Sequence, residues 1–319
     1  MLDIVIVNWN SGTLLKRAVL SVGAAEARVR AGRPSSASVQ VVVVDNASSD
    51  RSLEEMTSAI RGLNLPVDVV RNEANLGFAA ACNQGAQRGH GDFILFLNPD
   101  TALQPNALQE ALAFFADPAN RPVGICGIQL RDEDGRPSAS CSRFPTVANY
   151  LAQAVGLDRF APFRHLGPRM SEWDHASTQV VEQVMGAFLM IRRTVFAQLG
   201  GFDERFFMYF EEVDLSWRAR QAGWQSVFLA SAWSTHTGGG SSRAVKAQRL
   251  AYSLRSRLLY FAKHFGAMGV ASMWVITFLV ELPARLLLAS VRRSKREFSD
   301  TTRGYALALA SFLPGTRKG

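Results

Sequence analysis

Cysteine is scarce in this chain of 319 residues, which contains only Cys82, Cys126 and Cys141. Their spacing matches no zinc-binding pattern, and an odd number of thiols cannot all be paired within one chain. Both facts argue against a domain that is stabilised by disulfide bonds or by a structural zinc ion. A reducing, cytosolic compartment is the simple interpretation of so few cysteines.

Long uncharged runs and leader sequences are also lacking. The chain starts MLDIVIVNWN, which reads as a strand and has no basic stretch before it, so we expect no signal peptide. The longest apolar run, residues 265–280, has sixteen uncharged residues, whereas a spanning helix needs about 20. Internal repeats and low-complexity segments are absent from the sequence.

Acidic residues are few in the last quarter of the chain. Residues 241–319 carry fourteen Lys and Arg against three acids, a net charge of +11. Because the whole chain carries +8, residues 1–240 carry −3. A mildly acidic body with a basic, apolar tail predicts an anionic surface as a partner, and the Leu and Phe content favours a membrane over nucleic acid.

Apolar runs alternate with helical patterns along residues 1–130. The strands that we expect are 3–8, 39–44, 67–72, 92–100 and 123–130, and the expected helices are 12–30, 51–62, 75–89 (after a short loop) and 105–116. All-apolar strands alternating with helices predict a mostly parallel sheet covered by helices on both faces. Residues 131–182 contain four prolines and read as irregular, and an apolar element resumes at 184–193.

Polar side chains stand where the expected strands end. The carboxyl ends of parallel strands form the usual ligand-binding edge of such a sheet. An Asp-Asn pair alone is an ordinary turn, but four successive polar strand ends indicate a site. The residues concerned are Asn8, Asp45, Arg71 with Asn72, and Asn98 with Asp100.

A divalent cation is the ligand that the Asn98-Pro99-Asp100 sequence suggests. Mg²⁺ and Mn²⁺ bind carboxylates together with phosphate oxygens. His236, in the segment WSTHTGGGSS, is a candidate further ligand, and the glycines after it would allow backbone to approach a phosphate. A turn and a structural histidine are the alternative interpretation.

Three acids lie in an aromatic segment, FDERFFMYFEEVDLSW (202–217). Glu211, Glu212 and Asp214 would be costly to bury without partners, and a carboxylate in an apolar wall can act as a base near neutral pH. The alternative is a helix N-terminus whose acids form salt bridges with Arg218 and Arg220.

Several segments together resemble glycosyltransferase family 2, specifically its bacterial rhamnosyltransferase-like branch. They occur in the family's order over residues 1–242, which is far more specific than any one of them. The segments are IVIVNWN (4–10), VVVVDNASSDRS (41–52), RNEANLGFAAACNQG (71–85), FLNPDT (96–101), GAFLMIRR (186–193), GGFDERFFMYFEEVDLSWRARQAGW (200–224) and HTGGGSS (236–242).

The resemblance implies the GT-A fold and a role for each matching position. Asp100 and His236 would hold Mg²⁺ or Mn²⁺, and Glu212 would be the catalytic base, with Glu211 and Asp214 as alternatives because this chain has Glu-Glu where the family usually has Glu-Asp. The nucleotide-sugar site would be formed by Asn8, Asn10, Asp45, Asn46, Arg71, Asn75, Gly77, Asn83 and Asn98.

An inverting, metal-dependent glycosyltransferase is the activity that the resemblance implies. The expected reaction moves L-rhamnose from dTDP-rhamnose to a polyprenyl-diphosphate-linked or polysaccharide acceptor in cell-envelope glycan synthesis. The alternatives are a UDP-sugar enzyme (galactofuranosyl- or N-acetylglucosaminyltransferase) and a non-catalytic, membrane-anchored nucleotide-binding protein. A nucleic-acid binder is disfavoured because no nucleic-acid-binding motif is recognisable.

Two domains are expected, a catalytic domain at 1–242 and a membrane-associating helical region at 243–319. In the latter, Leu250, Leu254, Leu258, Phe261 and Phe265 fall on one helical face, opposite a face with Lys246, Arg249, Ser253 and Arg257. Glu281, Arg285, Arg292 and Arg296 are expected to share a face further on. We expect a peripheral position on the cytoplasmic face of the inner membrane.

Overall fold

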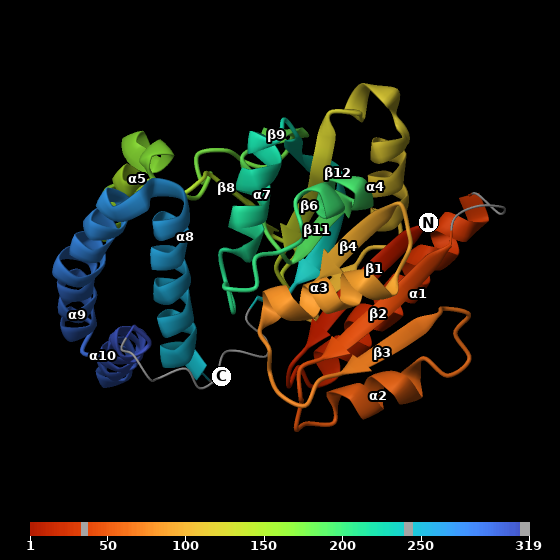
Figure 1. The fold of residues 1–319 in the computed structure, drawn as a ribbon, viewed down its shortest axis with the longest axis horizontal. Coiled ribbons are helices and arrows are strands. Elements are labelled where there is room, and N and C mark those ends of the chain that lie inside the picture. The colour runs from red at the N-terminus through yellow and green to blue at the C-terminus, as the bar shows by residue number, and fades with distance from the viewer. Residues whose placement is uncertain (33–37, 239–244, 313–319) are drawn as a thin grey trace. The chain divides into compact units, whose positions relative to one another are not determined.

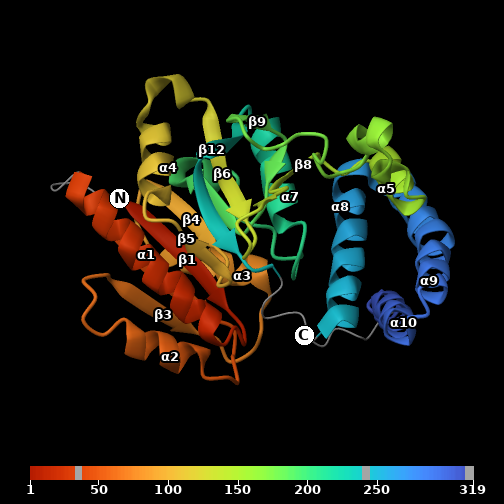
Figure 2. The ribbon, with the colours of Figure 1, turned by 180° about the vertical axis from the view of Figure 1, so that it is seen from behind.

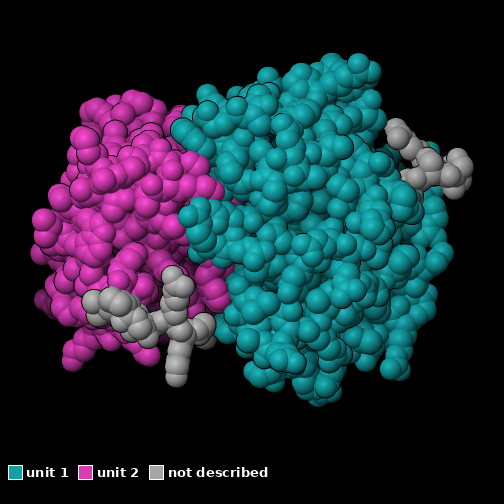
Figure 3. All heavy atoms as spheres, viewed as in Figure 1, with its two compact units in different colours: residues 1–142, 174–205, 212–241 teal, residues 143–173, 206–211, 242–319 magenta. Residues whose placement is uncertain are grey.

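The computed structural model describes residues 1–32, 38–238 and 245–312. The chain divides into two compact units, which Figure 3 distinguishes by colour. Unit 1 contains residues 1–142, 174–205 and 212–241, and unit 2 contains 143–173, 206–211 and 242–319. The C-terminal helices thus cluster with two earlier segments, whereas the expected boundary at 242/243 lies outside the described residues.

Unit 1 is built on a ten-stranded sheet whose first half is parallel (Figure 1). Strands β3, β2, β1 and β4 lie side by side in that order, all pointing the same way. Every residue of β1 is buried, as the all-apolar pattern predicts for a strand covered on both faces. The bounds are β1 Leu2–Asn8, β2 Val39–Asp45, β3 Val67–Arg71 and β4 Phe93–Leu97.

Helices α1 (Thr13–Gly32) and α3 (Phe78–Arg88) cover opposite faces of this parallel half, as Figures 1 and 2 show from the two sides. The small residues of α3 have a packing reason. A Cβ at Gly85 would lie 2.4 Å from Val5 Cγ1, so the glycine lets the helix approach β1 closely. The shorter helices α2 (Ser52–Ala59) and α4 (Ala107–Ala116) complete this region.

The second half of the sheet is mixed in direction. Strand β11 (Phe188–Arg192) lies antiparallel between β4 and β6 (Val123–Arg131). Strand β12 (Gln225–His236) runs parallel to β6 and antiparallel to β5 (Thr101–Leu103), which brings residue 236 opposite residue 101. The short strands β7 (Pro137–Ser138) and β9 (Gln179–Val181) pair with β6 and β12, and β8 (Cys141–Ser142) pairs with β10 (Gln183–Val184).

Residues 131–182 are more regular than the sequence predicts. Helix α5 (Val147–Ala154) forms there, and its start is fixed by a capping box in which Thr146 and Asn149 exchange hydrogen bonds. The 3₁₀ segments Leu157–Arg159 and Ala161–Leu166 follow it. The expectation of an irregular excursion missed this helix because Asn, rather than Glu or Gln, completes the box.

The C-terminal helices form a hairpin within unit 2. Helix α8 (Lys246–Val275) contains one non-helical residue, Gly266, with φ 66° and ψ −162°. A π-helical segment (Ile276–Glu281), α9 (Leu282–Val291) and α10 (Lys295–Ala310) follow. In a straight helix residues 257 and 281 would be roughly 36 Å apart, yet Arg257 Nη2 donates to Glu281 Oε2 over 2.7 Å. The chain therefore reverses at Gly266.

Glu281 and Arg257 face the interior of this hairpin, contrary to the expected polar faces. Arg257 is 5% exposed and also donates to Thr277 Oγ1, while Glu281 accepts from Arg285 as well. Burial alone would raise the pKa of Glu281, but the charges of Arg257 and Arg285 lower it below its usual range. The pair therefore stabilises the hairpin above the ordinary titration range of a glutamate, and this contribution is lost as pH falls through the lowered pKa.

The expected face shared by Glu281, Arg285, Arg292 and Arg296 is also wrong, since α9 ends at Val291 and α10 begins at Lys295. The Leu/Phe face is confirmed in part: Leu254, Leu258 and Phe261 are buried, whereas Phe265 is exposed.

Candidate active site

The side chain of Asn8 joins the ends of β1 and β2. Its Nδ2 lies 2.7 Å from Asp45 Oδ1, 3.1 Å from Ser48 Oγ and 2.9 Å from Ser52 Oγ, and its Oδ1 accepts from Ser11. Asn8 is completely buried. With both ends of the amide engaged, Asn8 holds Asp45 in position rather than presenting a polar group to a ligand.

Asn10 organises the loop that follows β2. It has a left-handed backbone (φ 49°), and its Oδ1 accepts hydrogen bonds from the backbone N–H groups of Ser49 and Asp50. Burial would raise the pKa of Asp50, but hydrogen bonds from Ser52 and from the N–H of Gly12 lower it below the usual range. The loop is therefore tied to the start of α1 by an ionised carboxylate.

A chain of amides links the ends of β2 and β3 to the start of α3. Asn72 Nδ2 donates to Asn46 Oδ1 and Gln84 Oε1, both over 2.8 Å, and Asn46 Nδ2 donates to the carbonyl of Gly77. Gly77 has φ 89°, and its backbone N–H donates to Asn75 Oδ1 over 3.0 Å. The sequence-predicted residues Asn46, Asn75 and Gly77 thus meet in one network.

Arg71 ends β3 directly beside Asp45 in the parallel register. Its side chain is exposed and makes no hydrogen bond or ion pair with the residues that the structure describes. An uncommitted guanidinium next to a buried carboxylate at the ligand edge of the sheet is available to an anionic ligand.

Asp100 and His236, the two expected metal ligands, lie together. His236 Nε2 is 3.3 Å from Asp100 Oδ1, and both side chains are largely buried, at 16% and 10% exposure. Pairing of β12 with β5 brings them together, and the N–H of Thr237 donates to the Asp100 carbonyl. The glycines at 239 and 240 lie outside the described residues.

A divalent cation fits this pair. Adjacent ligands of a cation with bonds of about 2.1 Å are about 3 Å apart, close to the observed separation. Among the described residues no group of three or more His, Cys, Asp and Glu side chains could hold a metal. Mg²⁺ and Mn²⁺ are commonly held by one or two protein ligands together with substrate phosphates and water, so two side chains suffice if a diphosphate and water supply the remaining ligands.

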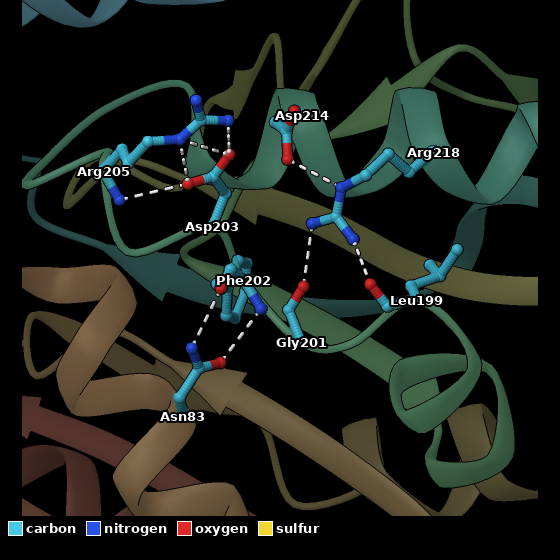
Figure 4. A network of polar contacts seen from close by, with 8 residues as sticks. All are labelled: Asn83, Leu199, Gly201, Phe202, Asp203, Arg205, Asp214 and Arg218. Carbon is cyan, nitrogen blue, oxygen red and sulfur yellow. Dashed lines mark hydrogen bonds and ion pairs between the residues drawn. The ribbon is translucent and has the colours of Figure 1, made fainter.

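The three acids of the 202–217 segment have different surroundings. Asp214 is completely buried and accepts from Arg218 Nε over 2.8 Å, and Arg218 also donates to the carbonyls of Leu199 and Gly201 (Figure 4). Asp214 therefore anchors the turn before helix α7 (Glu211–Gln221). Glu211 is 6% exposed, and Glu212 is half-buried.

Glu212 lies across from Gly186. A Cβ built on Gly186 would contact the Glu212 side chain at 3.8–4.0 Å. The next residue, Ala187, accepts from the N–H of Asn98 through its carbonyl. The half-buried acid is thus connected through two residues to the segment that carries Asp100.

Asn83, expected to bind the nucleotide-sugar, is committed elsewhere in this conformation. Its amide exchanges hydrogen bonds with the backbone N–H and carbonyl of Phe202 (Figure 4). It also donates to Glu204 Oε1 over 2.9 Å. Asn83 and Arg218 together fix residues 199–202. The salt bridge that the sequence offered between the acids and Arg218 is confirmed for Asp214. Ser48, Ser52 and Gly186 were not predicted individually, and their only sequence signal was membership of the resembling segments.

Comparisons with known proteins identify the family and the fold. Residues 3–200 match the sequence profile of glycosyl transferase family 2.

The chain belongs to glycosyl transferase family 2.

It is therefore a glycosyltransferase. The N-acetylglucosaminyl-diphospho-decaprenol L-rhamnosyltransferase of Mycobacterium tuberculosis is 29% identical over 93% of this chain and 96% of that protein. The rhamnosyltransferase WbbL of Escherichia coli is 24% identical over 54% of this chain and 62% of its own length. A structure of the mannosyltransferase PcManGT from Pyrobaculum calidifontis, in complex with GDP-Man and Mn²⁺, has a TM-score of 0.57 at 16% identity, covering 97% of this chain and 85% of that one. The present chain has the GT-A fold that the sequence resemblance predicted.

The ion pair of Asp214 with Arg218 predicts that Asp214 stabilises the fold and is not the catalytic base. Asp214→Asn should lower the free energy of unfolding by about 3 kcal/mol, because it leaves Arg218 charged and poorly paired in a mostly buried position. Turnover by the remaining folded protein should stay within a few-fold of wild type. Denaturant unfolding and activity per folded molecule measure the two effects.

The matched control is Asp203→Asn, which weakens an ion pair to Arg205, whose side chain is 61% exposed. It should cost about 1 kcal/mol or less. Unchanged stability of Asp214→Asn together with a loss of turnover of 100-fold or more, the scale of a lost general base, would contradict the anchoring role.

Proposed function

We propose that this family 2 enzyme transfers L-rhamnose from dTDP-rhamnose, with inversion, to a sugar carried on a polyprenyl diphosphate. The nearly full-length similarity to the mycobacterial L-rhamnosyltransferase supports both the sugar and the lipid-linked acceptor. The dTDP carrier follows from the rhamnosyltransferase resemblance. The proposal rests on the position of Glu212: a Cβ at Gly186 would contact its side chain, and the adjoining Ala187 accepts a hydrogen bond from Asn98, which supports a base near the Asp100 segment.

Each residue then has a distinct part in the reaction. Asp45, held by Asn8, accepts from the nucleotide base, and Arg71 pairs with a phosphate. Asp100 and His236 would hold Mg²⁺ or Mn²⁺; a bound cation neutralises charge on the departing diphosphate. The Mn²⁺ in the Pyrobaculum complex supports a divalent ion here.

Glu212 removes the proton of the acceptor hydroxyl as its oxygen attacks the anomeric carbon. The new bond joins the acceptor oxygen to C1, and the bond from C1 to the diphosphate oxygen breaks. The electron pair of that bond leaves with the nucleoside diphosphate. A single in-line displacement inverts the configuration at C1, and no sugar is bound covalently to the enzyme.

The helical hairpin of unit 2 supports a peripheral position on an anionic membrane surface. In the part of the chain that the structure describes, Lys246–Val291 is the one stretch whose length and apolar composition would suffice to cross a bilayer. One such stretch is weak evidence of a span. The reversal at Gly266 divides it into two helices, the first of which carries, besides the buried Arg257, four basic residues at positions 246, 249, 255 and 263.

The second helix presents an apolar stripe. Five side chains spaced four, seven or eight residues apart are between 51% and 84% exposed: Met268, Val275, Leu279, Leu287 and Val291. Residues 265–280 carry no charge, and Glu281 faces inward to Arg257. Because that ion pair ties the second helix along a basic helix, both are expected at the headgroup level, where the stripe meets acyl chains and the basic side chains at 292, 293, 295 and 296 meet phosphates.

The donor prediction is tested by turnover. Purified enzyme with Mg²⁺ or Mn²⁺ should transfer rhamnose from dTDP-rhamnose to N-acetylglucosaminyl-diphospho-polyprenol, with dTDP as the second product. Asp100→Asn should abolish transfer without lowering the thermal midpoint, because the cation loses its carboxylate. Mass spectrometry of the lipid product measures transfer. Preference for UDP-galactofuranose or UDP-N-acetylglucosamine in the same assay would overturn the assigned donor.

The base prediction concerns Glu212. Glu212→Gln should reduce kcat by roughly 10²–10⁴, the range for the loss of a general base, with donor affinity little changed. Glu211→Gln is the matched control and should retain most activity. Steady-state kinetics and calorimetric titration of donor measure the two quantities. The reverse pattern, a collapse only in Glu211→Gln, would move the base to that residue.

The membrane prediction concerns the stripe. Leu279→Glu combined with Leu287→Glu should weaken binding to vesicles containing phosphatidylglycerol by about tenfold or more, because two leucines that would contact acyl chains are replaced by negative charges that the anionic headgroups repel. Co-sedimentation measures binding. Leu63→Glu with Val180→Glu makes the same charge change on exposed side chains of unit 1 and should alter binding much less.

Equal loss in both double variants would mean that net charge, rather than the stripe, governs attachment. Labelling of single cysteines at positions 268 and 291 from opposite sides of sealed vesicles would contradict the peripheral position and indicate a spanning helix.

A further inference from the structure

Neither the backbone conformation nor the packing at position 186 requires a glycine. Its φ is not in the left-handed region, which is populated by other glycines of this chain such as Gly77 and Gly200. A Cβ at Gly186 would touch nothing closer than 3.8 Å, an ordinary van der Waals distance. By contrast, a Cβ at Gly85 or Gly127 would collide with valine side chains at 2.4 and 2.6 Å. Alanine would therefore fit at position 186 in the absence of a ligand.

The atoms nearest to such a methyl group all belong to Glu212. They are its Cβ at 3.8 Å, Cγ at 3.9 Å and Cδ at 4.0 Å. Gly186 is itself half-buried. The missing side chain thus leaves space directly beside the carboxyl group that the proposed function makes the base.

The backbone on both sides of Gly186 is fixed. The N–H of Met185 donates to the Ser140 carbonyl over 2.9 Å, and the carbonyl of Ala187 accepts from Asn98 N–H over 3.1 Å. Ala187 is completely buried. Residues 185–187 are therefore held by hydrogen bonds to Ser140 and to Asn98, the residue that follows β4, and this backbone cannot easily move away from a bulky neighbour.

We propose that Gly186 keeps open the approach of the acceptor hydroxyl to Glu212 and so sets which acceptors can react. A hydroxyl on a sugar ring sits on a secondary carbon with two ring substituents, and that carbon needs room beside the base. Water needs much less room. The absence of a side chain at position 186 therefore allows a ring hydroxyl to reach Glu212. A larger residue at this position would lower transfer to a sugar far more than hydrolysis of the donor. This inference rests on the proposed function of Glu212.

The test compares Gly186→Ala with Gly23→Ala. Gly23 is also half-buried, lies in helix α1, and would place its Cβ in ordinary contact with Leu63 at 3.5 Å. Gly186→Ala should reduce kcat/KM for the lipid-linked sugar acceptor by about ten- to a hundredfold, the scale of one methyl forced into occupied space. Its thermal midpoint should not fall, because alanine restricts the unfolded chain. The affinity for dTDP should stay within about twofold.

Hydrolysis of dTDP-rhamnose by water, measured without acceptor, separates the two explanations. A substitution that disturbs the structure of the site would lower hydrolysis together with transfer. Gly186→Ala should hydrolyse the donor within about threefold of wild type, since a water molecule fits beside one methyl group. Gly23→Ala should match wild type in transfer and in hydrolysis. Gly186→Val, with a larger side chain, should reduce transfer further.

Two results would overturn the inference. Equal losses of transfer and hydrolysis would mean that the methyl group displaces Glu212 or the donor. Unchanged transfer would mean that the acceptor does not pass Gly186. Failure of the proposed function is recognised separately, because wild-type enzyme would then neither transfer rhamnose nor hydrolyse dTDP-rhamnose.

Discussion

The buried amide of Asn8 connects β1, the end of β2 and the start of α2 through hydrogen bonds to Asp45, Ser48 and Ser52. Without these bonds Asp45 would be a buried carboxylate lacking its closest donor, which is a costly state. The loop that follows β2 is shaped by Asn10, whose Oδ1 accepts from the N–H groups of Ser49 and Asp50. This end of the sheet is thus held by hydrogen bonds within the protein, so that little ordering would remain to be done if a ligand binds there.

The three neighbouring acids Glu211, Glu212 and Asp214 lie in three different environments. Asp214 is fixed by Arg218, and Arg218 in turn fixes the backbone at residues 199–201. Glu211 is buried at the start of α7, and only Glu212 combines partial exposure with an open neighbour. A similar separation occurs in the tail, where Glu281 is turned inward so that an apolar stripe can face outward.

Local sequence patterns predicted the parallel half of the sheet well, because each apolar run and each strand-end residue acts over a few positions. Asn8, Asp45 and Asn98 were found in this way. Contacts between distant segments were not predictable. Insertion of β11 between β4 and β6, the meeting of Arg218 with Leu199 and Gly201, and the pairing of Arg257 with Glu281 all depend on the tertiary fold. Gly266 gave no sign of a reversal, since a glycine inside an apolar helix is common in membrane-active sequences.

We propose that a nucleoside diphosphate and a divalent cation meet at Asp100 and His236, in the region of Glu212. The most direct measurement is the anomalous scattering of Mn²⁺ in crystals of the full chain grown with dTDP. We expect one Mn²⁺ within about 2–2.3 Å of the Asp100 carboxylate and the His236 imidazole, in contact with the diphosphate, and the thymine ring beside Asp45. Mn²⁺ bound to the diphosphate but away from both side chains would contradict it.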